Sequence, residues 1–203
     1  MVQVLREAAH ENVEVVAANA ARMDFARQVG AERVTLVGNL PYHLTSPILF
    51  QVLDQRRHVS RGVFTVQEEV ANRLVAPPGN RTYGILTVLL GLYFEIEKMF
   101  VIPAGAFHPP PRVQSAVIRL VALPEPRAEI TSDERFRSLV KAAFAQRRKT
   151  LLNSLRSDPS LGSSDALRGT LQRVGIDPKR RAETLSVDEF ARLQRELSRA
   201  ADR

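Results

Sequence analysis

Residues 33–50 have the sequence RVTLVGNLPYHLTSPILF, in which a short apolar run leads through a proline-containing turn into a helix-like segment. The first five residues, RVTLV, are rich in β-branched side chains, as is typical of a buried strand. The turn at residues 39–42 (NLPY) leaves this strand at its carboxyl end. Ligands of parallel α/β sheets bind beyond the carboxyl ends of the strands. The stretch therefore predicts an α/β fold with a candidate site at the turn.

Strand and helix patterns alternate on both sides of this stretch, up to about Leu123. Further strands are predicted at residues 13–17 (VEVVA), 62–66 (GVFTV), 94–101 and 113–121, and helices at residues 67–75 and 83–92. Such alternation predicts a mostly parallel, doubly wound sheet. The last two strands follow each other directly, so we expect them to form an antiparallel pair that closes the sheet.

Helical patterns alone follow Pro124 and Pro126, which mark a linker. The expected helix signals are capping boxes from Thr131 to Glu134 and from Ser186 to Glu189, an N-cap at Ser163 or Ser164, and a C-terminal glycine, Gly175. We therefore expect two domains, an α/β domain at residues 1–123 and a small, basic, all-α domain at residues 124–203.

The composition excludes several classes of protein and site. The 203 residues are 44% hydrophobic, enough for one sizeable core or for a large domain with a small one attached. No apolar run approaches the roughly 20 residues of a membrane span, and the acidic residues near the start argue against a secretory signal. With no cysteine there is no disulfide, thiolate nucleophile or zinc ribbon, and the four histidines have no metal-ligand spacing. We expect a cytoplasmic protein without a metal and without a membrane partner.

The net charge of +7 favours an anionic partner such as a nucleic acid. Residues 125–203 contain 17 Lys+Arg against 12 Asp+Glu, whereas residues 1–124 contain 12 against 10. Most of the positive charge therefore lies in the predicted helical domain.

The turn at residues 39–42 contains groups suited to holding the amino group of a base. The side-chain oxygen of Asn39 and the carbonyl of Leu40 can accept the two amino hydrogens of adenine, which directs the nitrogen lone pair toward an electrophile. Pro41 restricts the backbone, and Tyr42 can stack on a base that has left its helix. No strong base is needed, because the nitrogen can lose its proton after the new bond forms. The alternative is an ordinary turn with a half-buried tyrosine.

Three segments together resemble one family, the rRNA adenine dimethyltransferases of the KsgA type. NLPYHLTSPILF at residues 39–50 resembles its N-L-P-Y-x-[IL]-[ST]-[ST]-P-[IL]-[IL] signature. AFHPPPRVQSAVIRL at residues 106–120 resembles its F-x-P-x-P-x-V-x-S-x-V segment. AFAQRRKTLLNSL and GIDPKRRAETLSVDEFARL, at residues 143–155 and 175–193, resemble its helical C-terminal domain. The resemblance extends from about residue 13 to the end.

The resemblance implies a Rossmann-like methyltransferase fold and a defined reaction. S-adenosylmethionine would donate two methyl groups, one at a time, to the amino nitrogen of each of two adjacent adenosines near the 3′ end of small-subunit rRNA, during ribosome maturation. The resemblance implies that residues 39–42 hold the target base and that Phe107 forms the second wall of the base sandwich. Alternatively, Phe107 could be a core residue.

Two other functions remain open at this point. Macrolide-resistance methylases of large-subunit rRNA share NLPY and the Phe-Pro region, but they lack the RRKTLLNSL stretch, so the small-subunit assignment is preferred. A non-catalytic rRNA-binding protein of ribosome assembly is the alternative from another class.

RNA contacts are expected from Arg147, Arg148 and Lys149, with Asn153 one helical turn later. The alternative is a solvated helix end, where cations are favoured anyway. Residues 179–181 (KRR) are a second candidate. Gln67, Glu68 and Arg73 match a family helix that flanks the pocket, or are surface residues; they are not assigned a catalytic role.

The cofactor half of the site is less complete. Methyltransferases of this class begin with a strand, a glycine-rich loop and a helix, but no two of the ten glycines form G-x-G. The resemblance begins at the third strand of the family. Asn19 stands where the family has an aspartate that binds the cofactor adenine, unless Asp24 is that acid, and Asn39 is a further cofactor ligand. We expect a monomer that, as this chain alone, binds S-adenosylmethionine weakly or not at all, whether it is a fragment or a short protein that has lost transfer.

Overall fold

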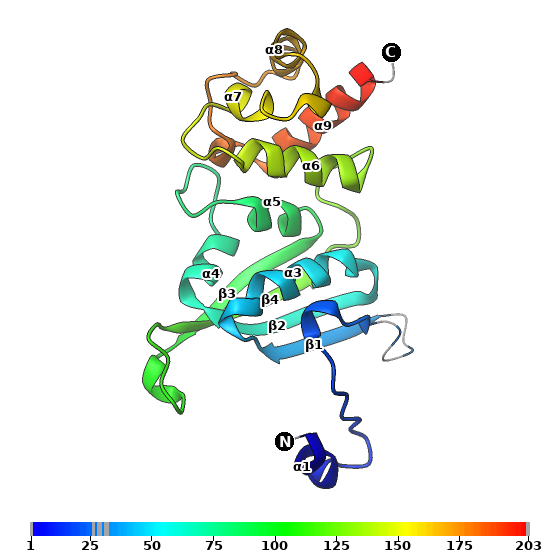
Figure 1. Cartoon of the computed structure of the whole chain (residues 1–203), viewed down its shortest axis with the longest axis vertical. Helices are drawn as coiled ribbons and strands as arrows, with labels where there is room; N and C mark the ends of the chain where they lie inside the picture. Colours follow the sequence, from blue (N-terminus) through cyan, green and yellow to red (C-terminus); the bar gives the residue numbers. More distant parts are fainter. Residues whose placement is uncertain (1, 26, 28–29, 31–32, 202–203) are drawn as a thin grey trace.

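The computed structural model describes residues 2–25, 27, 30 and 33–201, and Figure 1 shows the whole chain. One sheet has the strand order β1-β2-β4-β3. Its strands are β1 (Val34–Asn39), β2 (Val59–Gln67), β3 (Phe94–Ile102) and β4 (Ser115–Ala122). Four of the five strands expected from the sequence are therefore present, and their bounds differ from the expected ones by a few residues.

The directions of the strands agree with the expectation. β1 pairs with β2 in parallel, whereas β4 is antiparallel to both β2 and β3. The predicted antiparallel pair at the end is confirmed. The expected mostly parallel sheet is also found, because β1, β2 and β3 run in one direction and, among the described strands, β4 alone opposes them, inserted between β3 and β2.

Residues 13–17 do not form the predicted strand. A strand exists through its hydrogen bonds to a neighbour, and no described strand pairs with this segment. Its Val13 side chain is 51% exposed. Helix α1 (Val2–Ala8), which precedes it, buries no residue and lies away from the sheet in Figure 1.

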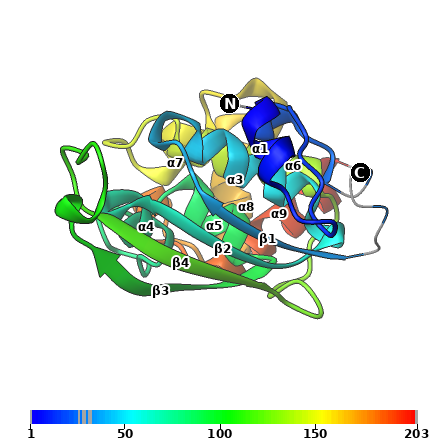
Figure 2. The same ribbon diagram turned by 90° about the horizontal axis from the view of Figure 1, so that it is seen from below.

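The helices of the α/β part place their apolar side chains against the sheet. They are α3 (Thr45–Asp54), α4 (Glu68–Leu74) and α5 (Ile85–Gly91). In α3, Ile48, Leu49, Val52 and Leu53 are buried, a spacing that forms one helical face. Figures 1 and 2 show α3 and α5 on the same face of the sheet.

The C-terminal helices are α6 (Asp133–Phe144), α7 (Leu151–Leu155), α8 (Ser164–Arg173) and α9 (Val187–Ala201). Short 3₁₀ turns also occur, namely η1 (Ala20–Arg22), η2 (Tyr42–Leu44), η3 (Arg56–His58), η4 (Ala104–Ala106), η5 (Pro159–Leu161) and η6 (Ala182–Thr184). Helix α6 contacts α5 on one side and α7 and α9 on the other, so its apolar residues join the two parts of the chain in one core (Figure 1). The domain boundary near residue 124 stays a prediction.

Two of the three expected helix starts are confirmed. Ser163 caps α8, and the backbone N–H of Glu189 donates to Ser186 Oγ (3.1 Å) while Glu189 Oε2 accepts from the Ser186 N–H (2.8 Å). The expected box at Thr131 is wrong by one residue, because Ser132 caps α6. The N–H of Thr131 instead donates to the buried Gln194 side chain (2.9 Å), which holds the start of α6 against α9.

Candidate active site

All five residues predicted to hold the adenine line one open cavity of about 340 Å³. Its lining consists of Asn39, Leu40, Pro41, Tyr42, Phe107, Pro109 and Pro111, and we call it the NLPY pocket. The residues come from two loops, one after β1 and one between β3 and β4. The fold thus brings together two motifs that lie more than sixty positions apart in the sequence.

The backbone of the first loop is fixed at both ends. Asn39 is the last residue of β1, and the N–H of Leu40 donates to the Thr65 carbonyl of β2 (3.0 Å). The Pro41 carbonyl accepts from the N–H of Leu44 (2.9 Å) and from Thr45 Oγ1 (3.3 Å). Leu40 and Thr45 are buried. The loop therefore holds its shape without a ligand.

Two acceptors of this loop are unused. Among the described residues, no group donates a hydrogen bond to the side-chain oxygen of Asn39 or to the Leu40 carbonyl. Asn39 is exposed, so water can reach its amide and a ligand can replace that water. Each of the two acceptors is thus free to accept a hydrogen bond from a ligand.

Tyr42 is held by Ser115, a residue for which the sequence predicted no role. The Tyr42 hydroxyl oxygen lies 2.7 Å from Ser115 Oγ, and Ser115, the first residue of β4, is fully buried. This contact ties the first loop to the strand that follows the Phe107 loop. The serine in the F-x-P-x-P-x-V-x-S-x-V segment was the available signal for it.

Phe107 belongs to the 103–114 loop and is partly buried, so its ring is not part of the core. The neighbouring Pro109 and Pro111 line the same cavity and restrict the backbone there. An aromatic ring on each of two loops, with acceptors beside one of them, suits a flat base with an amino group.

The three residues of the flanking segment do not line the NLPY pocket. Glu68 forms an ion pair with Lys98 of β3 (2.8 Å), and Arg73 forms one with Glu69 (2.9 Å). Gln67 lies opposite Ser115 in the sheet. Of these contacts, the Glu68–Lys98 ion pair joins α4 to the sheet, whereas the Arg73–Glu69 pair lies within α4.

The two cofactor candidates near the start are engaged in local turns. Asn19 Oδ1 accepts from the N–H of Ala21 (3.0 Å) and caps η1, and Asp24 Oδ1 accepts from the N–H of Arg27 (2.9 Å). Neither lines the NLPY pocket. The segment is held on α3 by Gln55, which donates to the Met23 carbonyl (2.7 Å).

The basic run lies in the exposed turn between α6 and α7, and Asn153 follows on the exposed side of α7. Arg147 forms an ion pair with Glu183 (3.5 Å), yet its side chain stays 60% exposed. Within the described part of the chain, Arg148 and Lys149 have no side-chain partner. In Figures 1 and 2 this turn and the 103–114 loop lie on the same, left side of the view, the turn well above the loop in Figure 1.

The second basic segment is partly used inside the helical part. Arg180 donates to both carboxylate oxygens of Glu189 (2.5 and 3.0 Å) and to the Thr184 carbonyl (2.6 Å). The hydrogen bonds from Arg180 hold the pKa of Glu189 below its ordinary value. Arg180 therefore stabilises the start of α9, and its role in RNA binding stays a prediction.

Two further features are absent from the described residues. No cluster of three or more His, Cys, Asp or Glu side chains that could hold a metal occurs among the residues that the structure describes. Within the same residues, no helix is both long enough and apolar enough to cross a membrane.

Comparisons with known proteins identify the family of the chain. The family "Ribosomal RNA adenine dimethylase" matches residues 1–199. The chain is 56% identical over 197 residues to Ribosomal RNA small subunit methyltransferase A of Myxococcus xanthus (strain DK1622), covering 97% of this chain and 70% of that protein. It is 49% identical over 208 residues to the protein of the same name from Anaeromyxobacter sp. (strain K), covering 97% and 72%.

Two solved structures share the fold. A dimethyladenosine transferase from Plasmodium falciparum has a TM-score of 0.80 at 20% identity, over 98% of this chain and 77% of that one. The 23S rRNA methyltransferase ErmE has a TM-score of 0.67 at 26% identity, over 97% and 78%. The sheet and its helices thus have the Rossmann-like methyltransferase fold. With a family match over residues 1–199, the chain belongs to the ribosomal RNA adenine dimethylase family.

Proposed function

We propose that the protein transfers methyl groups from S-adenosylmethionine to the N6 amino groups of two adjacent adenosines near the 3′ end of small-subunit rRNA. One observation carries the proposal: Asn39, Leu40, Pro41, Tyr42 and Phe107 line a single pocket that offers two unused acceptors. Proteins named for small-subunit rRNA methylation, related over 97% of this chain, support the choice of RNA. The large-subunit methylase and the non-catalytic binding protein are not favoured.

The residues of the NLPY pocket act on the target base in a defined way. The adenine leaves its stack, which costs a few kcal/mol, and lies between the rings of Tyr42 and Phe107. Stacking of the base on an aromatic side chain contributes about 1–3 kcal/mol and offsets part of that cost. Asn39 Oδ1 and the Leu40 carbonyl accept its two amino hydrogens. Both bonds turn the nitrogen lone pair away from the protein and toward the methyl donor, which supplies the electrophilic carbon. The nitrogen loses its proton to water afterwards.

The described residues form only part of a site for S-adenosylmethionine. The Asn19 oxygen already accepts from the N–H of Ala21, and the Asn39 oxygen is the acceptor proposed for the target adenine, so neither predicted cofactor ligand is left with an uncommitted side-chain oxygen. Val37 beside it on β1 is 79% exposed, so nothing in the described chain covers this edge of the sheet. We therefore propose that this chain alone binds S-adenosylmethionine weakly or not at all. Calorimetric titration tests this, and micromolar binding would contradict it.

Methyl incorporation tests the reaction. Undermethylated small subunits are incubated with labelled S-adenosylmethionine and either this chain or this chain joined to the N-terminal segment of the Myxococcus relative. We expect label in two adjacent adenosines with the fused protein, and none when the fusion also carries Asn39→Ala. Subunit binding without label from any version would favour the non-catalytic alternative.

We further propose that the protein acts as a monomer in the cytoplasm. The RNA contacts are proposed to come from Arg147, Arg148, Lys149 and Asn153, which lie in and after the turn between α6 and α7. Light scattering after size-exclusion chromatography checks the oligomeric state, and a stable dimer would contradict it.

A further inference from the structure

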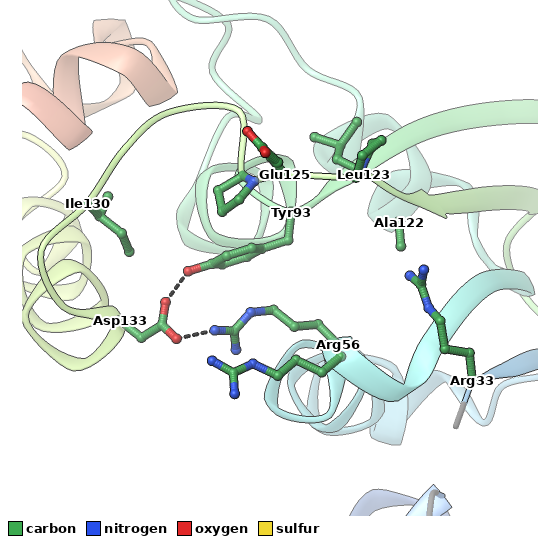
Figure 3. Close-up of a pocket in the computed structure, with 11 residues that line it drawn as sticks. Arg33, Arg56, Tyr93, Ala122, Leu123, Glu125, Ile130 and Asp133 are labelled. Carbon is green, nitrogen blue, oxygen red and sulfur yellow. Dashed lines mark hydrogen bonds and ion pairs between the residues drawn. The ribbon is translucent and has the colours of Figure 1, made fainter. Parts of the chain in front are cut away.

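A second cavity, of about 490 Å³, lies between the α/β part and the linker to the helices. Figure 3 shows this cavity, which we call the arginine pocket. Its charged and aromatic lining residues are Arg33, Arg56, Arg57, Tyr93, Glu125 and Asp133. Arg33 directly precedes β1, whereas Asn39 ends it, so about 20 Å of strand separates the arginine pocket from the NLPY pocket.

One wall of the arginine pocket is already fixed. Asp133 accepts hydrogen bonds from Arg56 and from the Tyr93 hydroxyl, as the dashed lines in Figure 3 show. The guanidinium carbon of Arg56 lies 4.2 Å from the centroid of the Tyr93 ring. This contact holds Arg56 in place, and the ion pair balances its charge with that of Asp133. Arg56 thus forms part of the wall and is not a free cation.

The other two arginines are not balanced in this way. Arg33 uses one N–H, to the Val59 carbonyl (3.3 Å), and its remaining donors have no acceptor in the described structure. Arg57 has no hydrogen bond or ion pair to any described residue. Both are exposed, and Glu125 is the one lining carboxylate left to oppose them. Figure 3 shows the guanidinium group of Arg56 extending toward Asp133 and that of Arg33 extending toward Ala122.

The rest of the arginine pocket is apolar. Leu123, Pro124, Pro126 and Ile130 of the linker line it. An apolar surface opposite two unpaired guanidinium groups matches a ligand with a flat apolar part and a compact anion. Its volume lies in the range of small-ligand sites, roughly 300–1,000 Å³. Guanidinium groups bind phosphate through parallel hydrogen bonds.

We propose that the arginine pocket binds a nucleotide, with its phosphate at Arg33 and Arg57 and its base against the linker prolines and Ile130. The nucleotide is either part of an RNA strand or free in solution. This site is separate from the adenine that reacts, and it does not depend on methyl transfer.

Binding to the full chain tests the proposal. Adenosine 5′-monophosphate, adenosine and inorganic phosphate are titrated by calorimetry, and a fluorescent single-stranded oligoribonucleotide by anisotropy, each against wild type and the double variant Arg33→Gln, Arg57→Gln. The double variant with Arg61→Gln and Arg168→Gln, two exposed arginines outside the pocket, is the matched control. Thermal unfolding of each variant verifies the fold, and Arg57→Glu alone is a second variant.

The expected result is that the pocket variants lower the affinity for the monophosphate, the oligoribonucleotide or both by about 10-fold or more, while the control does not. If the nucleotide is part of a strand, the salt dependence also becomes shallower by about 0.7 for each phosphate that the variant no longer neutralises. If only the affinity for the monophosphate falls, the site binds a free nucleotide. If only the affinity for the oligoribonucleotide falls, the site binds part of an RNA strand. Unchanged affinity for both probes in folded variants overturns the proposal.

Discussion

At the scale of single residues, the NLPY pocket depends on which hydrogen bonds are already made in the free protein. The Tyr42 hydroxyl is bonded to Ser115, whereas Asn39 Oδ1 and the Leu40 carbonyl accept no bond from the described residues. An adenine amino group therefore breaks no internal bond when it enters. The hydroxyl oxygen that fixes the Tyr42 ring is therefore a different group from Asn39 Oδ1 and the Leu40 carbonyl oxygen, which are proposed to hold the base.

Asn39→Ala removes one of the two proposed acceptors. We expect the rate of methyl transfer in the competent fused protein to fall by about 10- to 100-fold, which corresponds to about 1.4–2.7 kcal/mol of transition-state stabilisation. RNA affinity stays nearly unchanged, because phosphate contacts dominate it. Single-turnover rates measure the effect, with Asn12→Ala, an exposed loop asparagine, as the control. A normal rate in Asn39→Ala would rule out its role as an acceptor.

Tyr42→Phe and Ser115→Ala test the bond between the two loops. Each removes one partner of a 2.7 Å contact, and Ser115 is fully buried. We expect each substitution to lower the free energy of unfolding by about 1–2 kcal/mol, with a coupling energy of about 1 kcal/mol in the double mutant. Urea unfolding measures all four proteins. Strictly additive effects would show that the contact contributes nothing in solution.

At the scale of elements, the start of α9 shows how a short sequence signal combines with a distant charge. Ser186 and Glu189 cap each other as their spacing predicts. Arg180, nine positions before Glu189, then binds the same carboxylate. The capping box was visible in the sequence because it is local. The arginine was instead expected on the surface for RNA, because only the fold brings it to Glu189.

The Arg180–Glu189 pair makes stability depend on acid pH. Since the folded pKa of Glu189 lies below its unfolded value, near 4.5, its contribution is fully present above that value and is lost as pH falls through the folded pKa. Glu189→Gln should therefore make stability fall less steeply below about pH 4.5. Urea unfolding at several pH values measures this, with the exposed Glu134→Gln as the control. Equal acid slopes for wild type and Glu189→Gln would contradict the assignment.

At the scale of the whole molecule, α6 connects the two parts and leads to the basic turn. Its buried stripe includes Phe136, Leu139 and Val140, and the helix contacts both α5 and α9. The turn that follows lies on the same side of the molecule as the 103–114 loop in Figures 1 and 2. This placement fits the proposal that one RNA contacts both, with its phosphates at the turn and its base at the NLPY pocket.

The double variant Arg147→Ala, Arg148→Ala tests this path. We expect weaker binding to small-subunit RNA and a shallower dependence of log K on log[salt], by about 0.7–0.9 for each phosphate that the two arginines neutralise in the wild type. Filter binding over a range of salt concentrations measures both. Arg168→Ala with Arg192→Ala, two exposed arginines of α8 and α9, is the control. A salt slope equal to that of wild type would remove the turn from the interface.

The sequence by itself determined the α/β pattern, the antiparallel closing pair, the NLPY motif and two helix caps. These are local signals, in which a few neighbouring residues decide the backbone. Tertiary structure decided what depends on partners far away in the chain. Residues 13–17 have a strand pattern but no described neighbour, β4 inserts between β2 and β3, and Ser115 reaches Tyr42. The grouping of Arg33, Arg56 and Arg57 with the linker likewise follows from packing. The number of residues between two side chains in the sequence does not determine how far apart they lie in the folded chain.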